Sequence, residues 1–375
     1  MANNNDNKVL NVPHLRFPEF TEEWEEHALA EYLDFKNGLN PDVKRIGRGL
    51  PFISVMDILA DGTINYDSIR GKVEATEREI ENFSVEKGDI LFQRSSETLE
   101  DVGRANVYMD NRTAVYGGFV IRGRKIGDYN PLFFKYLLST PLARKRTCRM
   151  GAGAQHFNIG QDGLSKISLC FPLMEEQNKI ARLLSLIDER IATQNKIIDK
   201  LQSLIKGLRV CCMQRNGSDN VYLSEIAQIY QPQTISSAEL TEDGFLVYGA
   251  NGIIGKYKDY NHKTEQICIT CRGNTCGMVN YTKPMSWITG NAMVINTDKY
   301  QDKVYKKYLY HYLSAYNFNS IISGSGQPQI VRTPLEKLKI TLPTISEQKQ
   351  KAMILDKIQD KIEINHNVLN LYILQ

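Results

Sequence analysis

The sequence lacks the features that define membrane proteins and strongly basic nucleic-acid proteins. None of its apolar runs approaches the roughly 18 residues that a membrane span requires, and its polar opening does not resemble a signal peptide. The net charge is only +3, from 46 Lys and Arg against 43 Asp and Glu. These features predict a cytoplasmic globular protein, which could bind nucleic acid only if its basic residues gather on one face.

Cysteine is also scarce, and the pattern does not indicate a disulfide framework or a metal site. The seven cysteines are scattered along the chain, as expected of reduced thiols. Cys268 and Cys271 form a Cys-x-x-Cys pair with Cys276 nearby, but no second pair or neighbouring histidine completes four zinc ligands. We therefore expect no bound metal.

Several catalytic motifs are missing as well. No phosphate-binding Gly-x-x-x-x-Gly-Lys-Ser/Thr loop is present. Residues 130–133 come within one residue of the Asn-Pro-Pro-Phe pattern of adenine methyltransferases, but no glycine-rich cofactor loop precedes them. Pro131 is better placed to open a helix. Pro41 and Asp42 also lack the following Asp/Glu-x-Lys of a metal-dependent nuclease, so the sequence predicts no catalytic residues.

The most informative feature is an internal repeat, in which residues 163–172 correspond to residues 334–343. Each copy reads as a short strand that ends at a proline, and a Glu-Gln pair follows four residues after each proline. A loop of small residues that carries glutamine precedes each copy, at 151–155 and 324–327. The chain therefore consists of two similar halves.

A long helical pattern follows each copy of the repeat. Apolar residues recur there at alternating steps of three and four, which is typical of a coiled-coil seam, and Gln194 and Asn365 interrupt the two seams at equivalent positions of the repeat. If these helices pair, the connectivity makes them antiparallel; the alternative is that each lies on its own domain. Leu183 and Ile354 fall off the seam, so we expect them to contact another protein. The predicted seam and partner-contact residues are Leu183, Leu184, Ile187, Ile191, Gln194, Ile198, Leu201, Ile354, Leu355, Ile358, Ile362, Asn365 and Leu369.

Many short strands separated by turn signals precede each helix, which predicts an α+β fold with two pseudo-symmetric domains and two long antiparallel helices between them. The predicted strands are residues 51–55, 89–93, 118–122, 245–248, 267–270 and 291–295. The predicted boundaries are 1–172 for the first domain, 173–212 for the first helix, 213–343 for the second domain and 344–375 for the second helix.

Loops with small, amide and basic side chains recur in both halves. Arg, Asn, Gln and Ser can read base edges, and clustered cations with glycine-rich backbone suit phosphates. For any single loop a solvated surface is the simpler interpretation, but the duplication favours a bipartite linear ligand such as duplex DNA. The candidate DNA-binding residues are Arg94, Ser95, Arg104, Arg144, Lys145, Arg146, Gln155, Asn158, Asn251, Lys256, Thr270, Arg272, Asn274, Gln327, Gln329 and Arg332.

The chain resembles the specificity (S) subunits of type I restriction-modification enzymes over nearly its whole length. The resemblance rests on residues 15–20 followed by Trp24 and Glu25, on residues 248–255, on the Gly-Ser-Gly-Gln loop and on the Pro-x-x-x-Glu-Gln helix starts. It implies two target-recognition domains that each read half of a split DNA sequence, two spacer helices and no catalytic activity. It also implies two modification subunits as partners, and restriction subunits through them, with S-adenosylmethionine, ATP and Mg²⁺ bound on those subunits.

Two alternatives remain at this stage. A stand-alone DNA adenine methyltransferase would bind S-adenosylmethionine as an isolated chain. A helical scaffold protein that does not act on DNA would show no salt-dependent DNA binding.

Overall fold

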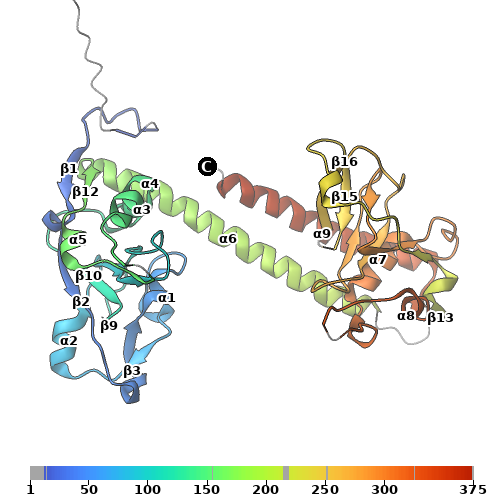
Figure 1. The fold of residues 1–375 in the computed structure, drawn as a ribbon, viewed down its shortest axis with the longest axis horizontal. Coiled ribbons are helices and arrows are strands. Elements are labelled where there is room, and N and C mark those ends of the chain that lie inside the picture. Colours follow the sequence, from blue (N-terminus) through green and yellow to red (C-terminus); the bar gives the residue numbers. More distant parts are fainter. Residues whose placement is uncertain are drawn as a thin grey trace, which may run out of the picture. The chain divides into compact units, whose positions relative to one another are not determined.

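The computed structural model describes residues 12–13, 15–153, 155–213, 219–250, 252–324 and 326–373 (Figure 1). Its internal contacts divide the chain into unit 1, residues 1–190, and unit 2, residues 191–375. Both units combine short strands with helices, which confirms the predicted α+β class. Within the described ranges, no helix has the length and apolar character needed to cross a membrane.

Unit 1 is built from short strands, short helices and the first part of one long helix. The strands are β1 (Glu25–Ala28), β2 (Leu33–Asn37), β3 (Ile46–Ile53), β4 (Lys72–Val73), β5 (Ser84–Val85), β6 (Ile90–Gln93), β7 (Ser95–Ser96), β8 (Ala105–Val107), β9 (Ala114–Tyr116), β10 (Val120–Lys125), β11 (Phe157–Asn158) and β12 (Ser168–Phe171). The helices are α1 (Val55–Ile58), α2 (Glu77–Phe83), α3 (Pro131–Ser139), α4 (Pro141–Cys148), α5 (Gln161–Ser165) and α6 (Met174–Met213).

The core of unit 1 lies around a four-stranded antiparallel sheet with the strand order β2-β10-β6-β8. Strand β6 is buried along its whole length, as a short apolar run between turns predicts. Helix α3 begins at Pro131, as predicted, and the side chain of Asn130 accepts hydrogen bonds from the first free N–H groups of the helix at 3.0 Å. The segment 130–133 that resembles a methyltransferase motif therefore forms the N-terminal cap and first turn of α3.

Unit 2 repeats this plan with different lengths. Its strands are β13 (Asp219–Tyr222), β14 (Gln228–Tyr230), β15 (Phe245–Gly249), β16 (Gly252–Tyr257), β17 (Ile267–Thr270), β18 (Val279–Tyr281), β19 (Trp287–Ile288), β20 (Ala292–Asn296) and β21 (Lys339–Leu342). Its helices are α7 (Lys306–Ala315), α8 (Arg332–Glu336) and α9 (Ile345–Ile373), together with the C-terminal part of α6. The four-stranded sheet β14-β20-β17-β18 matches β2-β10-β6-β8 strand for strand, and the pair β13-β21 matches β1-β12.

A buried glutamine fixes the start of each long helix. In unit 1, the amide of Gln177 donates to the carbonyl of Pro172 at 3.0 Å and accepts the N–H of Asn130 at 3.0 Å. In unit 2, Gln348 makes the same two contacts, to Pro343 at 2.9 Å and to the residue before α7 at 2.8 Å. Both glutamines are almost fully buried, and each pairs its own amide with backbone groups at the start of the helix. The repeated Glu-Gln pair therefore has a structural role.

The segment 15–20 packs on the start of α6. Arg16 donates two hydrogen bonds to the carboxylate of Glu176, at 2.8 and 2.7 Å, and Glu176 is 1% exposed. The ammonium of Lys179 lies 4.5 Å from the centre of the Phe17 ring. This segment therefore helps to hold the start of α6 in place. The contacts that the structure records for it do not include the loops predicted to bind DNA.

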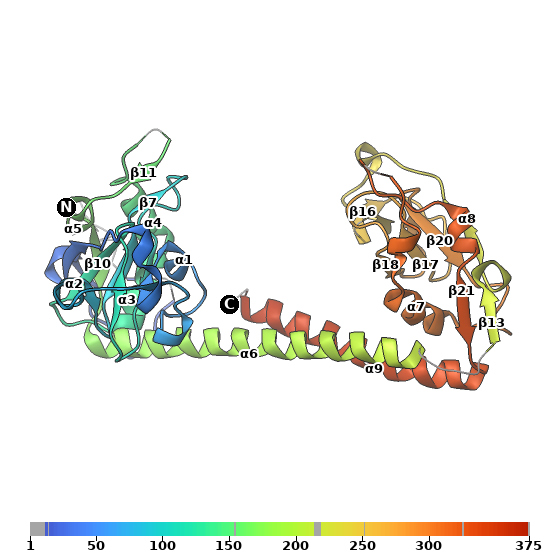
Figure 2. The same ribbon diagram turned by 90° about the horizontal axis from the view of Figure 1, so that it is seen from below.

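Within unit 2, α9 runs antiparallel to the last part of α6 (Figure 2). The amide of Gln194 donates to Asn365 Oδ1 at 2.5 Å, and near the other end Lys351 donates to the carbonyl of Cys212 at 3.0 Å. Between these contacts lies an apolar cluster of Leu201, Ile205, Leu208, Leu355, Ile358 and Ile362. The predicted pairing and its direction are therefore confirmed in unit 2, where the two polar seam residues bind each other.

Candidate nucleic-acid interface

In unit 2, two loops that are distant in the sequence lie side by side. Residues 271–277 follow β17, and residues 323–324 and 326–330 precede α8. Arg272 pairs with Gln329 in an antiparallel bridge, and the N–H of Gly273 donates to the Pro328 carbonyl at 3.0 Å. We call this pair of loops the loop ladder of unit 2. It brings together residues from both predicted DNA-binding loops.

The loop ladder of unit 2 borders a surface cavity of about 360 Å³. The cavity is lined by Tyr230, Gln231, Cys271, Arg272, Met293, Gln329, Ile330, Val331 and Arg332. Arg332 is held by an ion pair with Glu336 at 2.7 Å, whereas the structure records no ion pair or side-chain hydrogen bond between Arg272 and another described residue. Three of the predicted residues, Arg272, Gln329 and Arg332, thus converge here, and Arg272 keeps its guanidinium donors available to a ligand.

Unit 1 has an equivalent loop ladder, formed by residues 94–96 with 152–153 and 155–159. Strand β7 pairs with β11, and the hydroxyl of Ser95 donates to Asn158 Oδ1. The bridge between Ala152 and Asn158 recurs in unit 2 between Ser323 and Gln329, which are the equivalent positions of the repeat. The structure therefore brings Ser95 and Asn158 together as it brings Arg272 and Gln329 together.

Two arginines of unit 1 that were predicted to bind DNA, Arg144 and Arg146, instead bind oxygen atoms of unit 1 itself. Arg144 donates to the carbonyls of Glu100 and Val102 at 2.8 and 2.7 Å, and burial lowers its pKa. Arg146 forms an ion pair with Glu26 at 2.6 Å and donates to a carbonyl of β12. Contrary to expectation, their guanidinium groups hold α4 against its neighbours.

The remaining unit 1 candidates differ in exposure. Arg94, in the loop ladder, donates to the Gly118 carbonyl at 3.3 Å and is half-buried. Arg104 pairs with Asp101 at 2.7 Å but stays exposed. Gln155 is exposed within the loop ladder, whereas Lys145 is exposed on α4. The loop ladder of unit 1 thus presents mainly amide and hydroxyl groups.

In unit 2, Thr270 is a further correction. It is fully buried, and its hydroxyl donates to the Ala250 carbonyl at 2.6 Å, so it positions the loop and cannot reach a ligand. Asn274 and Gln327 are exposed, and Lys256 on β16 lies 3.4 Å from Asp243. Asn251 lies outside the described residues.

The two long helices also carry apolar side chains outside the seam. Leu183 is 45% exposed and its equivalent in the second half, Ile354, is 49% exposed, whereas Leu355 in the seam is fully buried. Leu186, Ile197, Leu204 and Met353 are exposed in the same way. The predicted seam residues Leu184, Ile187, Ile191 and Leu369 are half-buried, and Ile198 is buried. Each helix therefore presents apolar surface that its own unit does not cover.

A buried polar network that the sequence did not reveal connects three helices of unit 2. His311 on α7 is fully buried, and its Nδ1 lies 3.1 Å from Arg209 Nε on α6 while its Nε2 lies 3.0 Å from the Asp356 carboxylate on α9. Because arginine can only donate, Nδ1 accepts and the proton sits on Nε2. Burial lowers the pKa of His311. His311 lies in residues 308–314, which resemble residues 133–139, but this similarity does not indicate its partners.

Comparison with known proteins adds independent information. The type I restriction-modification DNA specificity domain matches residues 21–203 and again residues 216–371. The MjaVIII specificity subunit of Methanocaldococcus jannaschii is 26% identical over 93% of this chain and 88% of its own length, and the EcoKI specificity subunit of Escherichia coli is 26% identical over 44% of this chain and 38% of its own. The solved S subunit from M. genitalium covers 94% of this chain and 93% of its own with a TM-score of 0.68 at 16% identity, which shows a shared fold.

Proposed function

The chain belongs to the family of type I restriction-modification DNA specificity domains, of which it carries two copies, and from this premise we propose that each unit reads one half of a bipartite duplex DNA target. The observation that carries the proposal is the loop ladder, which recurs in both units with the same backbone pairing. Two equivalent sites on one chain suit a ligand that is itself linear and divided into two parts.

In unit 2, Arg272 and Gln329 are proposed to read base edges. An arginine fork matches the O6 and N7 acceptors of guanine, and a glutamine amide matches N6 and N7 of adenine. The two residues face each other across the loop ladder, so they would contact neighbouring bases. Arg332, held by Glu336, is suited to a phosphate, because a fixed cation positions the duplex without reading its sequence.

In unit 1, Asn158 is the proposed base-reading residue. Its Oδ1 accepts from Ser95 and its Nδ2 donates to the His156 carbonyl at 3.3 Å, so the amide is held in one orientation before DNA binds. Gln155 is exposed in the same loop and offers a second amide. Because unit 1 presents amides where unit 2 presents an arginine, the two half-sites would differ in sequence.

The exposed apolar side chains of the long helices are the proposed contacts for two modification subunits. Leu183 and Ile354 occupy equivalent positions, one in each unit, so each could contact one copy of the same partner. Restriction subunits would join through the modification subunits. In this arrangement the chain is not itself catalytic, and S-adenosylmethionine, ATP and Mg²⁺ would be bound by the partners.

The decisive test is to express the chain with its modification subunit and to map methylated sites. Replacing Arg272 by alanine should relax one position of one half-site by about 1–3 kcal/mol if the guanidinium binds a guanine bidentately. Arg272→Lys keeps the charge but loses the fork, so it should relax the same position.

Lys337→Ala is the matched control, since Lys337 is an exposed cation just after α8. This variant should leave the methylated sequence unchanged. If Arg272→Ala instead weakened methylation equally at every sequence while Arg272→Lys restored it, Arg272 would be a phosphate contact. A change in both half-sites would contradict the assignment of one half-site to each unit.

A further inference from the structure

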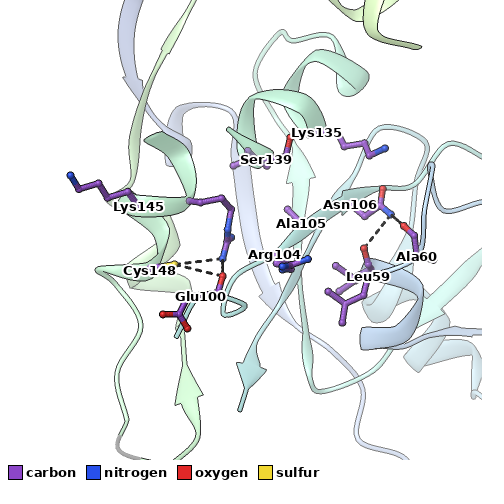
Figure 3. A pocket seen from close by; sticks show the side chains of 13 residues that line it. Leu59, Ala60, Glu100, Arg104, Ala105, Asn106, Lys135, Ser139, Lys145 and Cys148 are labelled. Carbon is purple, nitrogen blue, oxygen red and sulfur yellow. Dashed lines mark hydrogen bonds between the residues drawn. The ribbon is translucent and has the colours of Figure 1, made fainter. Parts of the chain in front are cut away.

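Unit 1 contains a cavity of its own, and no residue of the unit 1 loop ladder lines it. It has a volume of about 460 Å³ and lies between the end of α1, strand β8 and helices α3 and α4 (Figure 3). Arg104 stands in the middle of the view, with Lys135 and Asn106 on one side and α4 on the other. The size is that of a pocket for a small organic ligand, and it is much larger than a single phosphate needs.

The cavity contains a lysine that makes no ion pair with a described carboxylate. Lys135 on α3 is half-buried, and its one recorded contact is with the ring of Tyr136, whose centre lies 5.4 Å away. Burial lowers the pKa of its ammonium, and this effect outweighs the opposing charges of Asp188 and Asp61. A cation that is partly removed from water without a hydrogen-bonded anion favours an anionic ligand.

The other walls of the cavity are fixed and mixed in character. Arg104 is held by Asp101 at 2.7 Å while half of its side chain stays exposed, so it can face a second anion. Asn106 is buried, and its amide donates to the carbonyls of Ile58 and Ala60 at 3.3 and 3.4 Å. Ile58, Leu59 and Leu138 add apolar surface. The lining thus combines the cations of Lys135 and Arg104 with apolar side chains and one carboxylate, that of Glu100, and the cations and apolar groups suit a ligand with a phosphate and a flat organic part.

Unit 2 has a cavity of about 430 Å³ at the equivalent place of the repeat, beside β18 and α7, but its charges differ: two lysines and four carboxylates line it, those of Glu265, Asp356, Asp360 and Glu363. When residues 133–139 are matched to 308–314, Tyr310 takes the place of Lys135. The basic helix α4 has no basic counterpart after α7, where the chain forms the short 3-10 helix Phe318–Ser320. The lining of the cavity is thus mainly basic in unit 1 and mainly acidic in unit 2, so an anionic ligand is expected in unit 1 alone.

We propose that this cavity binds a small phosphorylated ligand of nucleotide size, once per chain, at a site separate from the loop ladders. Lys135 and Arg104 bind the phosphate, and the apolar side chains of α1 and α3 pack against the organic part. A phosphate of the DNA backbone offers the same charge, so the test must separate a free nucleotide from duplex DNA.

The experiment is calorimetric titration of the full chain with ADP, and with adenosine and inorganic phosphate as partial ligands. ADP should bind more tightly than either part. Lys135→Met, which keeps the aliphatic stem, and Arg104→Gln should each weaken ADP binding by about tenfold or more, as expected for the loss of a hydrogen bond to a charged group. Lys87→Met, at an exposed lysine of the same unit, should bind ADP as the unchanged chain does. Thermal unfolding of each variant verifies that it folds.

Three results would overturn the proposal. The first is no binding of ADP at millimolar concentration by a folded chain. The second is equal weakening by Lys87→Met, because the effect would then reflect net charge alone. The third is displacement of ADP by a nonspecific DNA duplex, which would make the cavity part of the DNA path; retention of ADP in the presence of the duplex supports a separate site.

Discussion

In unit 1 the sheet β2-β10-β6-β8 supports a loop ladder built from Ser95 and Asn158, and in unit 2 the sheet β14-β20-β17-β18 supports one built from Arg272 and Gln329. The contacts that recur are backbone hydrogen bonds and the two buried glutamines. The contacts that differ are those of exposed side chains. Backbone pairing depends little on side-chain identity, so the same backbone arrangement can carry different exposed side chains in the two units.

The two units also differ in how they use their cations. In unit 1, Arg144 and Arg146 are bound to carbonyl and carboxylate oxygens of the fold, and Lys135 faces a separate cavity. In unit 2, Arg272 remains available beside the loop ladder. Basic residues can therefore serve structure in one half and ligand binding in the other, which a charge count does not reveal.

The largest expected effect is a loss of stability, and it tests whether the two buried glutamines have the same role in the two units. Gln177→Ala and Gln348→Ala should each lower the free energy of unfolding by about 3 kcal/mol, because each removes a buried amide that pairs with a backbone N–H and a backbone carbonyl. Denaturant unfolding of the two variants measures the loss. Lys349→Ala, at an exposed neighbour of Gln348, is the control and should change little. Very unequal losses would mean that the glutamines have different roles in the two units.

A second experiment asks whether the two long helices offer equivalent partner contacts. Leu183→Asp and Ile354→Asp should each weaken binding of one modification subunit by about 2 kcal/mol, because a charge replaces an apolar contact while the fold, which leaves both positions exposed, is unaffected. Light scattering of the assembled complex should show the loss of one subunit from each single variant and of two from the double variant. Lys196→Asp, at an exposed position of α6, serves as the control. Complexes of unchanged size would refute this role of the helices.

The smallest expected effect is a difference between the two units in how their stability depends on pH. Unit 2 holds two buried histidines, His262 and His311, whose pKa values are lowered by burial, whereas the described histidines of unit 1, His27 and His156, are not buried. A lowered folded-state pKa means that unfolding takes up protons, so this stability is full above about pH 6.5 and is lost as the pH falls below it. The loss reaches at most about 1.4 kcal/mol per pH unit for each histidine.

Thermal unfolding between pH 7.5 and 5.5 checks this expectation. Hydrogen exchange should show the loss in unit 2 and not in unit 1. His262→Gln and His311→Gln should each flatten the pH dependence even where they lower stability at neutral pH. The lowered pKa of Asp356 does not interfere, because its contribution is lost only at lower pH, as the pH falls below the ordinary range of a carboxyl. An unchanged pH slope in both variants would show that these histidines do not titrate on unfolding.

The long helices, the repeat and several of the strands could be predicted from the sequence. Heptad spacing and strand alternation are local patterns, and the correspondence between residues 163–172 and 334–343 is visible without any coordinates. The polar seam pair was predictable for the same reason, since Gln194 and Asn365 interrupt equivalent patterns. The resemblance to specificity subunits rested on motifs of this local kind, and the family match agrees with it.

Which polar side chains are free to bind a ligand depends instead on tertiary contacts. Arg144, Arg146 and Thr270 look like ligand-binding residues in the sequence, but their partners are carbonyl groups and a carboxylate of segments that folding brings near. The surroundings of His311 and Lys135 could not be predicted either. Both ring nitrogens of His311 bind residues distant in the sequence, whereas Lys135 faces a cavity and forms no ion pair with a described carboxylate. Burial and pairing depend on contacts between segments far apart in the chain, and a one-dimensional pattern does not record those contacts.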